Sequence, residues 1–166
     1  MQKYKSIIIL LNLGILLILF NKSLLHKEET LKKGTLVLLE LVPVDPRSLM
    51  QGDYMRLNYA IVRENTRLKD KKNTLKSGYC VIEINDKGIA RKKRLQAGVF
   101  PKSESEYSIR FNSESSRGIN IGAESYFFEE GTAEKYEKAK YGGLMVDNKG
   151  NSILVGLFNE KLEEIK

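Results

Sequence analysis

Residues 143–158 read GLMVDNKGNSILVGLF and place two short apolar runs on either side of a polar segment. The intervening residues 147–151 (DNKGN) include Gly and Asn, which tolerate the positive φ angles of tight hairpin turns. The flanking runs, 143–147 and 152–158, have the length and composition of β-strands. This stretch therefore predicts an antiparallel hairpin, and it is the clearest local sign of a β fold in the chain.

Six further runs of this kind precede the hairpin. They cover residues 35–42, 53–63, 79–85, 89–95, 107–111 and 125–128. In the run 53–63, Met55, Leu57, Tyr59 and Ile61 alternate with more polar residues, which is the period of a half-buried strand. Eight runs separated by turn residues predict a mainly β fold, either an antiparallel sandwich or a barrel-like sheet.

One short helix is predicted within this β region. Thr132 can cap residues 133–140, and Gly142 and Gly143 can end the helix. The single cysteine, Cys80, alternates with Val81 within the predicted strand 79–85 and is interpreted as a small buried hydrophobic residue. The fold therefore combines many strands with one helix of about two turns.

The amino-terminal segment has a different character. Residues 7–20 (IIILLNLGILLILF) are almost entirely apolar, and the segment 4–25 is long enough to cross a bilayer. No alanine precedes Ala60, so an Ala-x-Ala site for signal peptidase is missing. An uncleaved signal anchor is therefore favoured over a removed signal peptide or a buried core helix. We expect residues 1–25 to form a transmembrane signal anchor that contacts the lipid bilayer through residues 4–25, with 26–33 as a juxtamembrane linker and 34–166 as a β-rich domain.

The charges are distributed unevenly along the chain. Lys and Arg number 28 against 21 Asp and Glu, which gives a net charge of +7. Residues 1–27 hold four lysines and no acidic residue, so residues 28–166 carry only +3. A nucleic-acid-binding domain would concentrate its positive charge on the folded part, so no nucleic-acid partner is expected.

Several kinds of catalytic or metal site are excluded by composition. The chain has one Cys and one His, His26, which cannot form an internal disulfide, a Cys/His zinc site or a Ser-His-Asp arrangement inside the β region. No metal and no cofactor are therefore predicted.

The most informative motif is PVDPRSLMQGDYMRLNY at residues 43–59, which reads as strand, rigid turn and strand. One interpretation is structural: the turn fixes the chain and places two tyrosines on opposite faces of the next strand. The other is a contact surface, because tyrosines are effective interface residues. The candidate residues are Asp45, Arg47, Gly52, Asp53, Tyr54, Leu57 and Tyr59.

This motif resembles that of the GDYXXLXY proteins, because Gly52, Asp53, Tyr54, Leu57 and Tyr59 occupy all five named positions. The resemblance covers roughly residues 34–159. It implies a bacterial protein with one membrane anchor and a domain outside the cytoplasm, and it implies no established activity. We therefore expect a non-catalytic binding or membrane-assembly role, with a polytopic membrane protein as a candidate partner.

An enzymatic alternative comes from a weaker resemblance to type I signal peptidases. These enzymes also have an N-terminal anchor, a β-rich outer domain, and a nucleophilic Ser before a Gly-Asp strand with a later general-base Lys. Here Ser48 precedes Gly52 and Asp53, and Lys92 or Lys93 would be the base. The order Ser48-Leu49-Met50 departs from the Ser-Met-x-Pro order of that family, and the run Arg91–Arg94 is typical of a solvated face.

Overall fold

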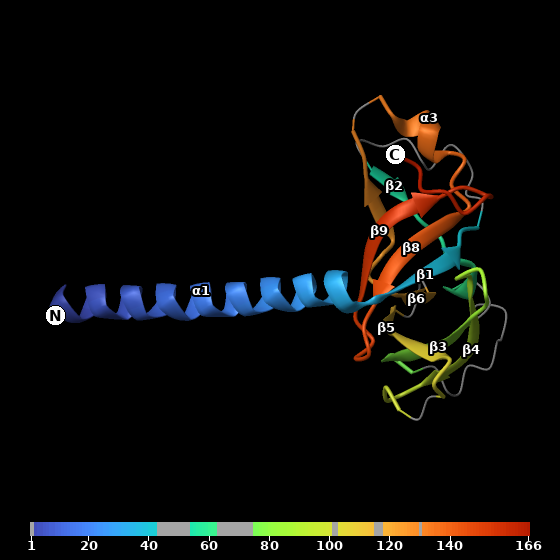
Figure 1. Ribbon diagram of the computed structural model, residues 1–166. Coiled ribbons are helices and arrows are strands. Elements are labelled where there is room, and N and C mark those ends of the chain that lie inside the picture. Colours follow the sequence, from blue (N-terminus) through green and yellow to red (C-terminus); the bar gives the residue numbers. More distant parts are fainter. Residues whose placement is uncertain (1, 43–53, 63–74, 101–102, 115–117, 130) are drawn as a thin grey trace.

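The computed structural model describes residues 2–42, 54–62, 75–100, 103–114, 118–129 and 131–166. The elements in chain order are α1 (Gln2–Lys33), β1 (Thr35–Glu40), β2 (Tyr54–Arg56), β3 (Ser77–Ile84), β4 (Ala90–Gln96), β5 (Glu106–Glu114), β6 (Gly118–Asn120), β7 (Ser125–Phe127), α3 (Ala133–Tyr136), β8 (Tyr141–Val146) and β9 (Ser152–Phe158). Figure 1 shows α1 as a long rod that leads into a β-rich domain.

The strands form three antiparallel sheets. Their orders are β1-β8-β9, β2-β7 and β4-β3-β5-β6. The two larger sheets are joined by backbone contacts, since the Leu38 N–H donates to Gly88 O at 2.9 Å and Leu38 forms a parallel bridge with Ile89. The predicted fold class, mainly antiparallel β with one long apolar N-terminal helix, is confirmed.

The hairpin predicted from residues 143–158 is formed by β8 and β9, and β8 begins slightly earlier, at Tyr141. Asp147 organises the turn, because its Oδ1 accepts the N–H groups of Lys149 and Asn151, each at 2.8 Å. Gly150 has a φ of 85°, which a residue with a side chain adopts only with strain. The turn chemistry therefore matches the sequence pattern closely.

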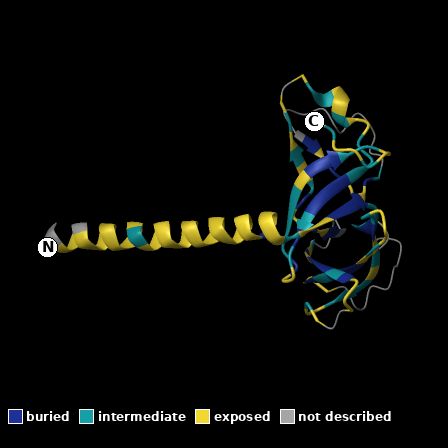
Figure 2. Ribbon diagram, in the orientation of Figure 1, coloured by how far each residue is buried: buried dark blue, intermediate teal, exposed yellow. Residues whose placement is uncertain are grey.

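The hydrophobic core lies where the sheets meet, and Figure 2 shows it as the dark interior of the domain. Its largest fully buried side chains come from strands of different sheets and from the segment after β2. They include Val37, Leu39, Tyr59, Ile82, Ile109, Phe111, Leu144 and Leu157. Cys80 is also buried, as predicted. Because these positions are spread from residue 37 to residue 157, the core requires almost the whole domain.

Helix α1 differs from the domain in its exposure. It contains 32 residues and is about 48 Å long. The segment Ile7–Lys33 is long and apolar enough to cross a membrane, with a mean hydropathy of 2.2 in its most apolar window and none of that window buried. Residues 26–33, which we expected to link anchor and domain, continue the same helix.

Two local predictions were wrong. Helix α3 has only four residues, and the Thr132 hydroxyl donates to Glu129 O at 2.6 Å instead of capping the helix. Gly142 and Gly143 lie inside β8, where the aromatic rings of Tyr59 and Phe158 pack against them.

The predicted strand 53–63 is likewise shorter than expected. The strand is limited to β2, and residues 60–62 are helical. Only its alternation of buried and exposed residues agrees with the prediction.

Candidate functional site

The second half of the motif lies between two other strands. The Leu57 N–H donates to Glu124 O at 2.8 Å, which extends the pairing of β2 with β7. On the other side, the Val42 N–H donates to Asn58 O at 2.8 Å, and Leu41 forms an antiparallel bridge with Tyr59. The motif therefore connects the end of β1 to the β7 region.

Tyr59 is the central side chain of this part of the motif. It is 1% exposed, and its hydroxyl donates to Ala123 O at 2.7 Å. Burial, with a smaller effect from Glu124, raises the pKa of Tyr59 above its ordinary value, so the hydroxyl keeps its proton. Its ring also occupies the space beside Gly142, where an added Cβ would lie 2.9 Å from Tyr59 Cε1. Tyr59 thus joins three segments of the core.

The described motif residues alternate as predicted. Met55, Leu57 and Tyr59 are buried, whereas Arg56 and Asn58 are exposed. Leu57 and Tyr59 therefore stabilise the fold and do not form a surface.

The other motif candidates are not placed in the same way. Asp45, Arg47, Gly52 and Asp53 lie outside the described residues. For Tyr54 the structure gives the position at the start of β2, opposite Phe127.

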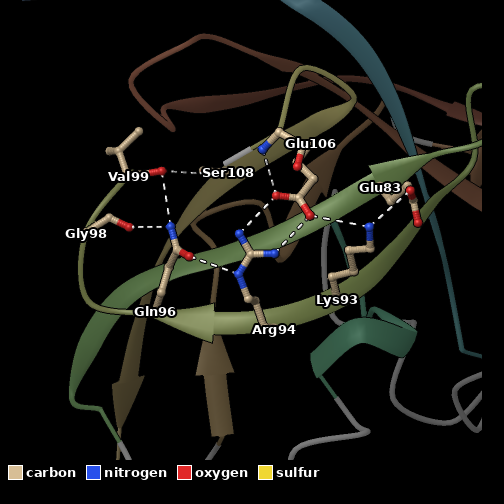
Figure 3. Close-up of polar contacts among 9 residues, drawn as sticks. Glu83, Lys93, Arg94, Gln96, Gly98, Val99, Glu106 and Ser108 are labelled. Atoms are coloured by element: carbon tan, nitrogen blue, oxygen red, sulfur yellow. Dashed lines mark hydrogen bonds and ion pairs between the residues drawn. The ribbon is translucent and has the colours of Figure 1, made fainter. Parts of the chain in front are cut away.

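A second polar cluster surrounds Glu106 on the β3–β4–β5 face (Figure 3). Glu106 is 5% exposed, and its two carboxylate oxygens accept hydrogen bonds from the Arg94 guanidinium, both at 2.9 Å. The Ser103 N–H donates to Oε2 at 3.0 Å, and Lys93 Nζ lies 3.3 Å from Oε1. Arg94 first, then the Ser103 N–H and Lys93, lower the pKa of Glu106 to about 2.

A β-bulge explains why two consecutive cations reach one carboxylate. Val81 pairs with Arg94 and Ile82 with Lys92, so Lys93 is the extra residue on β4. Successive side chains of a regular strand point to opposite faces, and a bulge redirects them. The prediction of a solvated run at Arg91–Arg94 therefore missed these ion pairs. They depend on the register between β3 and β4, which the sequence of β4 alone does not reveal.

The cluster also holds the chain that follows β4. Arg94 Nε donates to Gln96 Oε1 at 3.1 Å, and Gln96 Nε2 donates to Gly98 O at 2.8 Å and Val99 O at 3.1 Å (Figure 3). The Ser108 hydroxyl donates to the same Val99 oxygen at 3.3 Å. The charged and polar groups of the Glu106 cluster thus pair with one another and fix the loop between β4 and β5.

This arrangement bears on the peptidase alternative. Ser48 lies outside the described residues, so its distance to either lysine is not defined. Hydrogen bonds to Glu83 and Glu106 raise the pKa of Lys93, whereas a general-base lysine needs a lowered pKa. Lys92, the other candidate base, lies on β4 and also interacts with other groups of the protein. The electrostatics therefore disfavour Lys93 as a catalytic base.

The described residues contain no group of three or more His, Cys, Asp or Glu side chains that could hold a metal ion. Their buried carboxylate, Glu106, is engaged by cations of the chain itself. Its position suits it to stabilising the sheet.

A third cluster joins α1 to the β8–β9 turn. Thr30 is 2% exposed, and its hydroxyl lies 3.3 Å from Asp147 Oδ2 and 3.2 Å from His26 O. Asn151 Nδ2 donates to Asp147 Oδ2 at 2.7 Å and lies 3.0 Å from His26 Nε2. We call these four residues, Thr30, His26, Asp147 and Asn151, the helix junction.

Two features stabilise the helix junction. Burial alone would raise the pKa of Asp147, but hydrogen bonds from Asn151, the Lys149 N–H and Thr30 outweigh it and lower that pKa. The helix then ends at Lys33, and the N–H of the next residue, Gly34, donates to Thr30 O at 2.9 Å. An added Cβ at Gly34 would overlap that oxygen. No local sequence pattern predicts this junction, because its partners come from opposite ends of the chain.

A model of the GDYXXLXY protein family matches residues 16–157, from within α1 to the next-to-last residue of β9. Comparisons with curated proteins and with solved structures gave no match. The matched segment covers most of the chain and includes the motif that ends in Leu57 and Tyr59. The chain therefore belongs to the GDYXXLXY family.

Proposed function

We propose that this chain is a single-pass membrane protein whose β-rich domain lies outside the cytoplasm and has a non-catalytic role in binding or assembling a membrane partner. The observation that carries the proposal is α1, whose apolar side chains are exposed on every side and which is joined to the domain through the helix junction. A helix that is apolar all round is stable only when protein or lipid covers it.

The dimensions of α1 support an anchor. Residues 4–25 rise about 33 Å as a helix, against a hydrocarbon core of roughly 30 Å. The lysines at the two ends, Lys5 and Lys22, can extend their ammonium groups toward the headgroups. Glu28 is the first acidic residue of the chain and follows the apolar segment. The anchor and the polar end of the helix are therefore clearly separated.

The continuous helix has a consequence for partner choice. From Leu25 to Lys33 the helix continues for about 12 Å without a break, and Thr30 attaches it to the domain. Such a connection holds the domain at a fixed height and orientation above the membrane. A fixed position favours a partner in the same membrane over a soluble one, because less orientational freedom is lost on binding.

The polar clusters support a non-catalytic role. In the described residues, Glu106 is paired with Arg94 and Lys93, and Asp147 accepts hydrogen bonds from Asn151 and the turn. Catalytic acids and bases need pKa values near the working pH, whereas these carboxyl groups have lowered values. Both clusters are thus suited to structural roles.

Topology is tested by protease treatment of cells that carry the full chain with a C-terminal tag. We expect alkaline washing to leave the chain in the membrane, and protease to remove the tagged domain from intact cells or, where an outer membrane is present, from spheroplasts. A matched tag on a cytoplasmic protein controls for lysis. Release by alkali would contradict the anchor, and protection until lysis would contradict the outside location.

The assembly role is tested by crosslinking and co-purification of the full chain. Tyr54→Ala should lose a polytopic membrane partner while the domain keeps its unfolding midpoint, and Asn58→Ala, which changes an exposed neighbour, should keep the partner. A Tyr54→Ala protein that unfolds would favour the structural interpretation of the motif. An unchanged set of partners would contradict a contact role for Tyr54.

A further inference from the structure

A cavity of about 320 Å³ lies where α1 meets the β domain. Ser23, His26 and Lys27 form its wall on the helix side. The opposite wall comes from β5, the region of β6, the turn between β8 and β9 and the start of β9, and it includes Arg110 and Asn151. The cavity is thus built by two parts of the chain that are far apart in sequence and held together by the helix junction.

The charged side chains that line this cavity are all basic. Lys27 and Arg110 are its two cations, and His26 lies beside them, whereas no Asp or Glu is among the lining residues. In the described part of the chain, no carboxylate lies within salt-bridge distance of Lys27 or Arg110. Asp147 is not a lining residue, and its oxygens accept hydrogen bonds from Thr30 and Asn151. The cavity therefore favours an anionic group.

The lining is amphipathic as well as basic. Its apolar lining residues are the partly exposed Ile153 and the more buried Phe111 and Ile121, and Asn112 and Asn120 line it with polar residues. The volume falls at the lower end of the range for small-molecule sites. An anionic group attached to a short apolar segment fits this combination better than a bare inorganic ion.

The cavity also lies at a particular depth. His26 directly follows Leu25, the last apolar residue of the segment 4–25, and Ser23 and Lys27 are within one helical turn of it. If α1 spans the membrane, as proposed above, this wall lies at the level of the lipid headgroups. The ligand most available at that depth is a phospholipid.

We propose that the cavity binds the phosphate-bearing headgroup of an anionic phospholipid from the leaflet next to the domain. The Arg110 guanidinium donates to the phosphate oxygens, and Lys27 adds a second positive charge. The glycerol and the first methylene groups lie against the apolar lining. Because Lys27 belongs to α1 and Arg110 to β5, one lipid contacts both parts and strengthens their attachment. This inference rests on the proposed anchor.

The test is native mass spectrometry of the full chain in a neutral detergent with added phosphatidylglycerol or phosphatidylcholine of identical acyl chains. We expect one retained phosphatidylglycerol and a preference of about tenfold over phosphatidylcholine. The double variant Lys27→Gln/Arg110→Gln should lose about tenfold in retention of phosphatidylglycerol, and Lys87→Gln/Lys138→Gln, which removes the same charge from exposed positions outside the cavity, should retain it.

Equal retention of the two lipids, or an equal loss in both double variants, would overturn the proposal. Displacement of phosphatidylglycerol by an equal concentration of inorganic phosphate would show that the site takes free phosphate and would overturn the lipid assignment. Alkaline extraction separates the two proposals: a wild-type chain that stays in the membrane without lipid preference contradicts only the headgroup site. If the double variant does not fold, the single variant Lys27→Gln, on exposed α1, decides by the same criteria.

Discussion

The core around Tyr59 and the helix junction around Thr30 each contain a buried hydroxyl group that contacts a distant segment. The Tyr59 contact lies within the β domain, whereas the Thr30 contact joins α1 to that domain. The Tyr59 hydroxyl donates to Ala123 O inside a large apolar cluster. The Thr30 hydroxyl lies 3.3 Å from Asp147 Oδ2. Thr30 itself is buried, whereas the other described side chains of α1 are mostly exposed. Similar burial therefore has unequal consequences: the first contact maintains the domain, and the second maintains its orientation.

The largest effect is expected from Tyr59→Ala. Removing a buried aromatic side chain leaves a cavity and should lower the free energy of unfolding by about 3–5 kcal/mol. Denaturant unfolding of the full chain in detergent, followed by tyrosine fluorescence or circular dichroism, measures this change. Asn58→Ala, at the exposed neighbouring position, should change stability by less than about 0.5 kcal/mol. Equal effects of the two variants would contradict the central role of Tyr59.

Gly142→Ala tests the same core from the opposite strand. Its new methyl group would lie 2.9 Å from Tyr59 Cε1, so we expect a loss of about 1–3 kcal/mol from overpacking. In the Tyr59→Ala background the space is open, and the loss should become smaller. Additive losses in the double variant, measured by the same denaturant unfolding, would show that the two positions do not contact each other.

Acid should weaken the domain and the helix junction over overlapping pH ranges, and the effect on the domain should begin at the higher pH. The pKa of Glu106 is about 2 in the folded protein against 4.5 normally, so the unfolded chain binds more protons between these values and stability falls as pH decreases from about 4.5 to about 2. The pKa of Asp147 is lowered from 3.8, so junction contacts weaken only below that pH.

Thermal unfolding at a series of pH values measures the first effect, and amide exchange of Asn151 measures the second. Glu106→Gln should flatten the pH dependence of the unfolding midpoint below pH 4.5. A midpoint that depends on pH as steeply in Glu106→Gln as in the wild type would assign the acid sensitivity to other groups.

The smallest effect on the domain is expected from Thr30→Val. This change keeps the shape of the side chain and removes the hydroxyl that lies near Asp147, so it costs the junction on the order of 1 kcal/mol. Amide exchange of Gly34 and Asn151 should become faster while the unfolding midpoint of the domain hardly changes. Thr30→Ser, which keeps the hydroxyl, is the matched control. A large fall in the midpoint would show that the junction is part of the core.

Local patterns predicted much of this fold because they report on short-range physics. The apolar helix, the β8–β9 turn with Gly150, and the alternation at Met55, Leu57 and Tyr59 all follow from the period of the chain and from its turn residues. Features that depend on strand register were missed. The bulge that brings Lys93 and Arg94 to Glu106 exists only once β4 is paired with β3, and no pattern within β4 encodes that pairing.

The candidate site was predicted less completely for the same reason. The motif identified Leu57 and Tyr59, and the structure assigns both to the core. The helix junction and the cavity beside it combine residues such as His26 and Asn151, which no local motif relates. The helix predicted over residues 133–140 is shorter than expected because Lys140 already pairs with strands: its N–H donates to Phe158 O, and its carbonyl oxygen accepts the Leu41 N–H.

The pairing of the first strand with late ones has a consequence for the order of folding. Thr30 and Asp147 are 117 positions apart, and β1 pairs with β8. At typical rates of synthesis, on the order of ten seconds separates the appearance of the two partners. During that interval β1 lacks its neighbour β8, so the pairing of β1 into its sheet forms late. A chain that stops before β8 leaves Val37 and Leu39 of β1 exposed to proteases and chaperones.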